Sequence, residues 1–197
     1  MTERADGRRE RGRRKRARLV AATLRVVERD GVAGVTHRAV ADEAGLAKTA
    51  GTYYFDSIDD LLIAALTEDF EKYANELANA LGGRSSPAQL AKHLADYLHR
   101  QRRRTIAEYE LYLLAARRPA LRPAALRWYE LMDQVAASYT EDPVARTAFV
   151  ATVDGLFVRS LVEAQAPSQD RVRAVLEHVL ASAEATASRR RVAQSRP

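Results

Sequence analysis

Residues 35–62 read VTHRAVADEAGLAKTAGTYYFDSIDDLL, and this stretch decides the fold of the chain. The pattern predicts two short helices joined by a tight turn and followed by the start of a third helix. Thr36 is a candidate N-cap of the first helix, because its hydroxyl can accept a hydrogen bond from a backbone N–H group. Gly45 follows that helix at a position where glycine adopts the left-handed conformation at little cost.

The second short helix, over residues 48–54, is small, polar and rich in hydroxyl groups before it becomes aromatic. Its own apolar face is too small to hold it, so it is better suited to pressing a polar surface against a flat, polar partner. A helix, a short turn with glycine and a second helix form the helix-turn-helix of DNA-binding proteins, whose second helix enters the major groove. The segment therefore predicts binding to double-stranded DNA.

The same residues resemble the TetR family of one-component transcriptional regulators. The family pattern has a Thr that opens the second helix, an Ala-acidic-Ala-Gly turn, an aromatic recognition helix that ends in Phe, and a Ser before an acidic-acidic-Leu helix start. This chain carries these features at Thr36, 41–45, 52–55, Ser57 and 59–61. The resemblance covers residues 15–66. The chain departs from the pattern at Ala47, Thr52 and Ile58, where the family commonly has a small hydroxyl residue, Tyr and Lys.

We expect the recognition helix to read bases and its surroundings to hold phosphates. Lysine can donate to guanine, and threonine can hydrogen-bond a base edge or touch a thymine methyl group. The candidates for base contact are Lys48, Thr49, Thr52 and Tyr53. Tyr53 and Tyr54 can equally anchor phosphates, and one of them can belong to the core. The candidates for backbone contact are Thr36, His37, Arg38, Arg13, Arg14 and Arg16.

The positive charge of the chain is concentrated at its N-terminus. Residues 1–18 hold nine Lys or Arg and three Asp or Glu, a net charge of +6 that equals the net charge of the whole chain. Ahead of a helix-turn-helix, such a run favours a phosphate-binding arm over a passive solvated tail. We predict a disordered basic arm over residues 1–13. The basic residues 189–197 have no motif beside them and are predicted to be a disordered tail.

Composition narrows the class of protein. The chain has 197 residues, of which 47% are hydrophobic and 29% charged, as expected of an ordinary globular protein. It has no cysteine, which excludes disulfides, thiolate nucleophiles and cysteine-bound zinc. The N-terminus lacks the apolar run of a secretory signal, and no segment is apolar enough for a membrane span. We therefore expect a cytoplasmic protein without membrane contact.

The rest of the chain predicts an all-α fold of about nine helices. Apolar residues recur at three- and four-residue spacing, and Gly and Pro fall between the periodic segments. Residues 82–87 form a break, with Pro87 in the first turn of the next helix and Ser85 or Ser86 as its cap. The predicted domains are a helix-turn-helix domain over 14–57 and a helical effector-binding and dimerisation domain over 58–188.

The last two helices predict a homodimer. The eighth predicted helix has Pro143 in its first turn and continues through Val162. Its apolar residues cover a broad arc, so this helix must bury two sides. One side can face a symmetry mate, although a central core helix in a single chain would show the same pattern. The resemblance implies pairing through the last two helices. The predicted interface residues are Phe149, Val153, Leu156, Val172, Val175 and Val179.

An enzyme is the rival class, and the sequence does not favour it. The four histidines are not placed as metal ligands, and His93 and His99 are six residues apart. No HExxH, GxSxG or phosphate-binding glycine loop occurs. We expect no catalytic residue, metal or cofactor.

The sequence favours a pocket for a small-molecule effector over an enzyme active site. Buried Tyr and Trp need hydrogen-bond partners, so a helical domain rich in them can line a mixed apolar and polar cavity. The resemblance implies such an effector site. The candidates are Tyr97, Tyr109, Tyr112, Leu113, Trp128, Met132 and Phe157.

The sequence thus predicts a ligand-responsive repressor that binds a palindromic operator as a homodimer. We expect the ligand to favour a spacing of the two recognition helices that does not fit successive major grooves, with the fourth predicted helix, over residues 58–81, transmitting the change. Two alternatives stay open. One is a constitutive or architectural DNA-binding protein without effector, and the other is a protein-binding adaptor.

Overall fold

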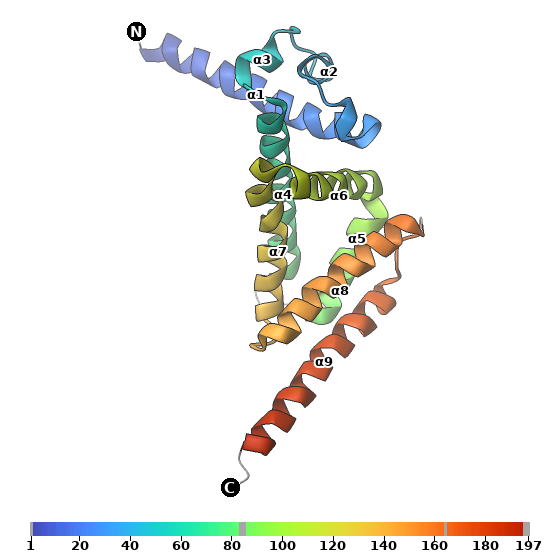
Figure 1. Ribbon diagram of the computed structural model, residues 1–197. Coiled ribbons are helices and arrows are strands. Elements are labelled where there is room, and N and C mark those ends of the chain that lie inside the picture. Colours follow the sequence, from blue (N-terminus) through green and yellow to red (C-terminus); the bar gives the residue numbers. More distant parts are fainter. Residues whose placement is uncertain (1, 83–85, 164, 195–197) are drawn as a thin grey trace. The chain divides into compact units, whose positions relative to one another are not determined.

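The computed structural model describes the backbone of residues 2–82, 86–163 and 165–194, and the side chains of residue 7 and of residues 9–182 within those ranges. In these ranges the fold is all-α without strands, as predicted. The elements are, in order, α1 (Thr2–Asp30), η1 (Val32–Gly34), α2 (His37–Glu43), α3 (Ala50–Tyr54), α4 (Ile58–Leu81), α5 (Pro87–Arg100), α6 (Arg102–Arg117), η2 (Pro119–Leu121), α7 (Arg122–Ala137), α8 (Pro143–Val162) and α9 (Gln169–Gln194), as Figure 1 shows.

Side-chain caps fix the predicted helix starts. The Thr36 hydroxyl accepts a hydrogen bond from Ala39 N at 3.0 Å. Ser86 forms a capping box with Gln89, and Pro87 occupies the first turn of α5. Asp142 accepts from Val144 N at 2.9 Å at the start of α8. These contacts satisfy backbone N–H groups that a helix leaves unpaired at its N-terminus.

Both predicted disordered ends differ from the structure. Helix α1 begins at Thr2, so residues 2–13 are helical and not a disordered arm. Glu10 pairs with Arg13 and Arg14 at three- and four-residue spacing, which supports a helix in a basic sequence. Helix α9 continues to Gln194, so residues 189–194 are helical as well. Met1 and residues 195–197 lie outside the described residues.

The chain forms two compact units. Unit 1 comprises Met1–Lys72 and Arg103–Ala125, and unit 2 comprises Tyr73–Arg102 and Leu126–Pro197. Unit 1 thus contains the helices α1, α2 and α3, the first part of α4 and nearly all of α6. The packing units therefore cut across the predicted domain boundary at residue 57.

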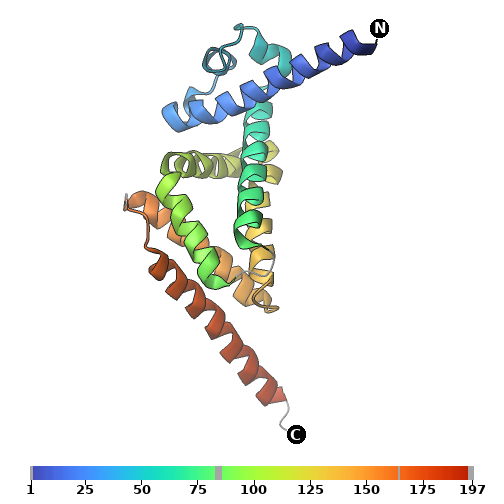
Figure 2. The same ribbon diagram turned by 180° about the vertical axis from the view of Figure 1, so that it is seen from behind.

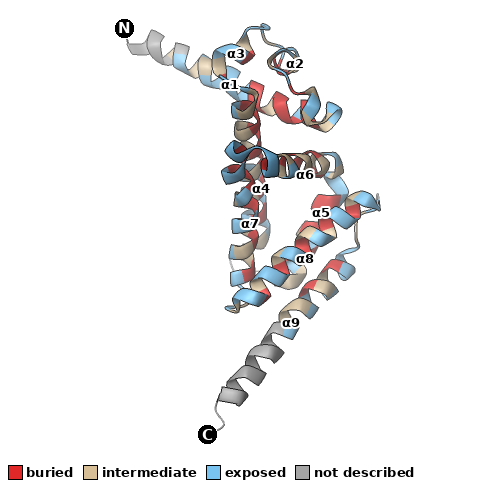
Figure 3. Cartoon of the chain, in the orientation of Figure 1, coloured by how far each residue is buried: buried red, intermediate tan, exposed pale blue. Residues whose placement is uncertain are grey.

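The core of unit 1 is built on α1. Its buried residues face α2, the Phe55 ring and α4, and they appear as the red part of α1 in Figure 3. Helix α6 contributes Ala107 and Leu111 to the same core. The members on α1 are Leu19, Val20, Ala22, Leu24, Val26 and Val27. The recognition segment is therefore held by an apolar base made of three other helices.

In unit 2, α9 packs against α5 and α8, and the three helices lie side by side in both views (Figures 1 and 2). The buried residues include Leu90 and Leu94 of α5, Phe149 and Val153 of α8, and Leu176 of α9. Among the described residues, no helix combines the length and the apolar character needed to cross a membrane.

Candidate nucleic-acid interface

Arginines of α1 hold the turn of the helix-turn-helix. Arg18 donates to the backbone carbonyls of Ala44 at 2.6 Å and Gly45 at 3.3 Å. Gly45 has φ +62°, as the sequence predicted. Arg25 and Arg29 donate to the two oxygens of Glu43 at 2.7 and 2.6 Å, and these hydrogen bonds lower the pKa of Glu43. Helix α2 and the turn are therefore fastened to α1 by polar contacts as well as by the core.

The recognition helix α3 is pressed against α2 through a glycine. A Cβ atom at Gly51 would lie 2.7 Å from the His37 carbonyl oxygen and 2.9 Å from the His37 Cβ. Any larger residue would push the two helices apart. Phe55, directly after α3, is 4% exposed. The back of α3 is thus fixed at both ends, and this leaves one face for a partner.

That face carries the predicted base-reading residues. Lys48, Thr49, Thr52 and Tyr53 are all exposed, and Tyr53 is 80% exposed. Tyr54 is half-buried, packs against the core of unit 1 and meets the Tyr53 ring edge-on at 4.8 Å. Of the two tyrosines, Tyr53 is therefore the one free to reach a base. Thr49 stands at the N-cap position of α3 without a side-chain cap, which leaves its hydroxyl on the surface.

An open groove runs along this face. It has a volume of about 520 Å³ and is lined by residues of the turn and of α3, together with Lys15 of α1. Lys15 was not among the predicted contacts, although it belongs to the basic run at the N-terminus. Its place in the groove adds a cation beside the hydroxyl groups of Thr49 and Thr52.

The residues predicted to hold the DNA backbone fall into two groups. Arg38 is exposed, and its nearest acidic partner is Asp42 at 3.8 Å, so it is free to meet a phosphate. The Thr36 hydroxyl caps α2. His37 is half-buried behind α3, and its Nε2 atom is buried without a hydrogen-bond partner. The contacts of Thr36 and His37 in this structure are therefore structural: they support α2 and its packing against α3.

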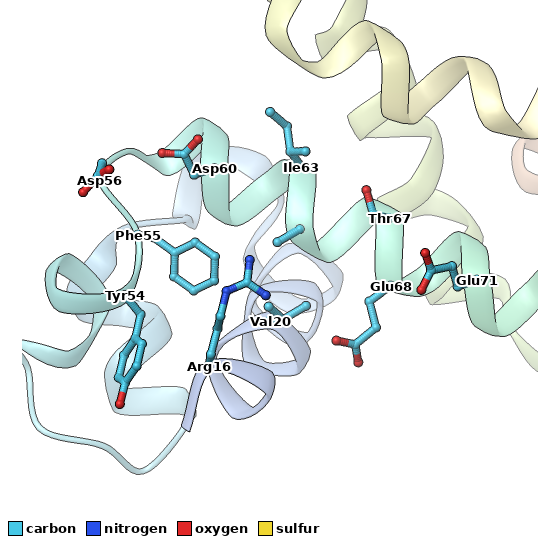
Figure 4. A pocket seen from close by; sticks show the side chains of 11 residues that line it. Arg16, Val20, Tyr54, Phe55, Asp56, Asp60, Ile63, Thr67, Glu68 and Glu71 are labelled. Carbon is cyan, nitrogen blue, oxygen red and sulfur yellow. The ribbon is translucent and has the colours of Figure 1, made fainter. Parts of the chain in front are cut away.

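The three predicted arginines of α1 lie in two different environments. Arg13 and Arg14 are exposed and pair with Glu10, whose pKa is lowered by their hydrogen bonds. The Arg16 guanidinium lies 4.8 Å from the centroid of the Phe55 ring. Arg16 lines a groove of about 610 Å³ together with Asp56, Asp60, Glu68 and Glu71. Figure 4 shows the Arg16 side chain beside the Phe55 ring. Cation–π attraction and the nearby carboxylates direct Arg16 into this groove.

Unit 2 contains an aromatic cluster, formed by the rings of Tyr73, His93, Tyr97, Trp128 and Phe157. Tyr73 lies 4.8 Å from Tyr97 and 5.3 Å from Trp128, between ring centroids. Phe157 contacts Trp128 at 5.6 Å and Tyr97 at 6.3 Å. The cluster contains three of the predicted pocket residues. Met132, a fourth, is fully buried in the same unit.

A carboxylate lies at the edge of this cluster. Trp128 donates its indole N–H to Asp154 Oδ1 at 3.1 Å. Burial, followed by the neighbouring Asp154 carboxylate, raises the pKa of Tyr129 to about 12. Sequence reasoning missed Asp154, because its contact with Trp128 joins α7 to α8 and leaves no local signature in the sequence. It also left out Tyr73 and His93.

The remaining predicted pocket residues are in unit 1. Tyr109 and Tyr112 of α6 are half-buried and meet edge-on at 5.7 Å. Leu113 is 72% exposed and lines an open surface groove of about 650 Å³ with Val32 and Glu110, so it does not line an enclosed cavity in the interior. The helix periodicity of α6 turns Leu111 inward at 0% exposure, and Leu113 consequently points outward.

Comparison with known proteins agrees with this geometry. The profile described as "Bacterial regulatory proteins, tetR family" matches residues 19–65, and the profile "Tetracyclin repressor-like, C-terminal domain" matches residues 85–182. A member of the TetR family from Streptomyces coelicolor A3 is 37% identical with a TM-score of 0.73, covering 84% of this chain and 97% of that chain. The chain belongs to the TetR family.

Other TetR-fold neighbours and relatives extend the comparison. The multidrug binding protein EbrR in complex with ethidium is 38% identical, with a TM-score of 0.74 over 84% of this chain and 98% of EbrR. The transcriptional repressor KstR of Mycobacterium tuberculosis is 27% identical over 81% of this chain, which spans only 63% of KstR. The regulator BetI of Brucella anthropi is 25% identical over 85% of this chain and 92% of BetI. This TetR-family chain is a DNA-binding transcriptional regulator.

The predicted dimer residues of this TetR-family chain do not share one surface. Phe149, Val153 and Val172 are at most 1% exposed within their own chain, so they cannot pack against a second copy. That part of the prediction is wrong. Leu156, Val175 and Val179 are half-buried. The broad apolar arc of α8 contains two opposite faces, and the predicted residues were drawn mainly from the inner one.

Proposed function

We propose that the chain is a ligand-responsive repressor that binds a palindromic operator as a homodimer. The observation that carries the DNA-binding part is an exposed surface formed by Lys48 and Thr49, directly before α3, and by Thr52 and Tyr53 on α3, whose back is fixed by Gly51. Lysine and hydroxyl groups match the donors and acceptors of base edges in the major groove. The repressor assignment is supported by KstR, which is described as a transcriptional repressor.

The outer face of α8 supports the homodimer. It carries a stripe of exposed small or apolar residues at spacings of four and three, which we call the α8 stripe: Val144, Ala148, Ala151, Gly155, Val158 and Val162. Val144, Val158 and Val162 are 67%, 45% and 81% exposed. A stripe with this period is the pattern of a helix that packs along another helix. A second copy of the same helix is self-complementary to it, as a two-fold axis requires.

The centre of the α8 stripe suits a close approach between two helices. A Cβ built at Gly155 meets no atom within 4 Å, so the chain itself does not use this glycine for packing. A glycine in the middle of a helix costs roughly 1 kcal/mol relative to alanine. Contact with the backbone of a neighbouring helix across Ala151 and Gly155 would offset that cost. Half-buried Val175 and Val179 of α9 extend the apolar surface available to the partner.

The aromatic cluster supports an effector that is aromatic and positively charged. EbrR has been solved with ethidium, proflavin and malachite green, which are aromatic cations. Rings attract a cation through their faces, and a carboxylate compensates its charge. The rings of Tyr73, Trp128 and Phe157 with Asp154 at their edge provide both features in this chain. Because the rings touch one another, a ligand must separate them, and this couples binding to a change of packing.

Such coupling would regulate DNA binding by a shift of equilibrium. The two recognition helices of a dimer must meet half-sites about 34–36 Å apart, so a ligand that prefers another spacing lowers DNA affinity. By thermodynamic linkage, operator DNA must weaken ligand binding by the same factor. The constitutive DNA-binding protein and the adaptor remain the alternatives, and they differ from this proposal in lacking the linkage.

Direct binding of malachite green, followed by calorimetry, tests the effector part without DNA. We expect saturable binding to the wild-type chain and an affinity reduced about tenfold or more in Asp154→Asn, because the half-buried Asp154 carboxylate would compensate the charge of a bound cation. Asp170→Asn is the matched control, since Asp170 is an acidic residue of α9 whose side chain is 84% exposed. Equal affinity in all three proteins would place the dye elsewhere and remove Asp154 from the proposal.

A further inference from the structure

A single arginine of α6 joins three helices of unit 1. Arg104 Nε donates to Asp69 Oδ1 of α4 at 2.7 Å, and its terminal NH2 group contacts the same oxygen. Its other terminal nitrogen donates to Glu28 Oε1 of α1 at 2.9 Å. The exposed fractions of the three side chains are 21% for Arg104, 26% for Glu28 and 9% for Asp69. We call these residues the Arg104 cluster.

The hydrogen bonds of the Arg104 cluster require a guanidinium group. This planar group can donate to two carboxylates in fixed directions, which the point charge of a lysine cannot do. Removing the arginine would leave two carboxylates of like charge in a site with little access to water, so they would repel each other. The contact between α1 and α4 at Glu28 and Asp69 therefore depends on Arg104.

Glu28 belongs to the helix that carries the DNA-binding turn. Arg18 and Arg25 of the same helix hold α2 and Gly45, as described above. Glu110, also on α6, accepts a hydrogen bond from Val32 N at 2.9 Å, directly after the end of α1. Helix α6 thus fixes the C-terminal end of α1 at two points, and α1 in turn supports α2 and the recognition helix.

Arg104 also lies where the chain passes from one unit to the other. Arg102, two residues earlier on the first turn of α6, is part of unit 2. Its guanidinium donates to the Leu161 carbonyl at 2.7 Å, in the last turn of α8. The first turn of α6 therefore carries one arginine bound to the end of α8 and one bound to α1 and α4, and these two arginines are linked by a continuous helical backbone.

We propose that Arg104 is a positioning residue for DNA binding, which keeps α1 and the recognition segment in register with α4 and α6. A displacement of the first turn of α6 then reaches the DNA-binding residues through Glu28. The part concerning ligand control rests on the proposed function; the positioning of α1 does not. A purely structural ion pair would raise stability without affecting the operator affinity of the folded protein.

Hydrogen–deuterium exchange of Arg104→Gln tests the positioning directly, without DNA or ligand. Arg103→Gln is the matched control, because Arg103 is the exposed neighbour on the same turn. We expect exchange in the C-terminal half of α1 to be about tenfold faster in Arg104→Gln and unchanged in Arg103→Gln, under conditions in which both remain folded. Equal exchange of α1 in the two variants would overturn the proposal.

Operator affinity separates positioning from simple stabilisation. For Arg104→Gln we expect at least a tenfold weaker affinity at a temperature where circular dichroism shows the variant fully folded. Glu28→Gln should give part of this loss, and the double variant should lose less than the product of the two single effects, because both remove the same contact. An operator affinity equal to that of Arg103→Gln, with only a lower unfolding temperature, would reduce Arg104 to a structural role.

The ligand arm distinguishes this inference from the proposed function. In the wild-type chain, malachite green should weaken operator binding. In Arg104→Gln, the ratio of the operator affinities without and with dye should approach one, while the affinity of the DNA-free protein for the dye is unchanged. If the wild-type chain shows no dye effect, the effector proposal fails, and the exchange and operator measurements still decide the role of Arg104. An undiminished dye effect in Arg104→Gln would exclude Arg104 from the path between ligand and DNA.

Discussion

At the scale of single residues, the proposed DNA-binding surface contains two kinds of side chain: exposed ones that are available to base edges, and others whose contacts fix α2 and the recognition helix. Lys48, Thr49, Thr52 and Tyr53 are exposed and serve no buried contact, whereas Thr36 caps α2 and His37 lies behind α3. Arg38 is exposed as well, but it stands on α2 and not on the recognition helix. This division predicts different effects for substitutions that are only a few residues apart.

Lys48→Ala or Thr52→Ala should weaken operator binding by about 1–3 kcal/mol and relax the base preference at one operator position, because each removes a base-edge contact. Arg38→Ala should weaken binding to all sequences alike, since a phosphate contact carries no sequence information. Selection of bound DNA from a random pool with each variant measures both effects. A changed sequence preference for Arg38→Ala together with an unchanged one for Lys48→Ala would reverse these roles.

His93, a member of the aromatic cluster, makes the stability of the folded chain dependent on pH. Burial lowers the pKa of His93 below its ordinary value of 6.5, Glu76 and Asp96 oppose this shift, and Arg100 adds to it. The unfolded chain then binds the proton more readily than the folded chain does. The stability that neutral His93 contributes is therefore fully present above pH 6.5 and is lost as the pH falls through the folded pKa.

Urea unfolding between pH 7.5 and 5.5 measures this contribution. The unfolding free energy of the wild-type chain should fall more over this range than that of His93→Gln, which has no group to protonate at this position. His178→Gln removes an exposed histidine and should follow the wild-type curve. If the His93→Gln and wild-type curves run parallel, the lowered pKa of His93 is not coupled to folding.

At the scale of elements, α8 shows what periodicity can and cannot decide. Its length, its Asp142 cap and its apolar character follow from the sequence, and its start at Pro143 is as predicted. The sequence cannot tell which apolar face is turned inward, because Phe149 and Val153 on one side and Val144 and Val158 on the other are equally apolar. Packing against the other helices of unit 2 decides this, and it buries Phe149 and Val153.

A similar limit applies to the effector residues. Trp128 and Phe157 could be predicted as buried aromatics from their spacing, but the contact of Asp154 with Trp128 joins two helices and has no local signature. The packing of α6 in unit 1 includes contacts of Arg104 and Glu110 with residues more than 70 positions earlier in the chain, which no local pattern indicates. Local signals such as Thr36, Gly45 and Ser86 were predictable because their partners are only a few residues away.

The α8 stripe makes a prediction about assembly. Val158→Asp should convert a dimer into a monomer, because it places a charge in the middle of an apolar helix contact. Leu126→Asp is the matched control, since Leu126 is a similarly exposed apolar residue on α7. Analytical ultracentrifugation at micromolar concentration measures the state. A wild-type monomer, or a Val158→Asp dimer beside a monomeric Leu126→Asp, would contradict the proposed interface.

At the scale of the whole molecule, the proposed DNA-binding residues belong to unit 1 and the aromatic cluster to unit 2, and the chain passes from one unit to the other within α4 and α6. Family membership establishes the regulator, and the proposals concern what controls it. The basic helix at the N-terminus should make operator binding strongly salt-dependent, because each phosphate contact releases counterions. Affinities must therefore be compared at one fixed salt concentration.

The most direct test of ligand-controlled operator binding is the affinity for a fluorescent palindromic operator, selected from a random pool, with and without malachite green. We predict that one dimer binds the two half-sites and that saturating dye weakens this binding about tenfold or more. Repeating the titration with an unrelated DNA-binding protein on its own site controls for dye that binds DNA directly. Operator affinity that does not change with dye, or that falls equally for the unrelated protein, would contradict a ligand-responsive repressor and leave a constitutive DNA-binding regulator.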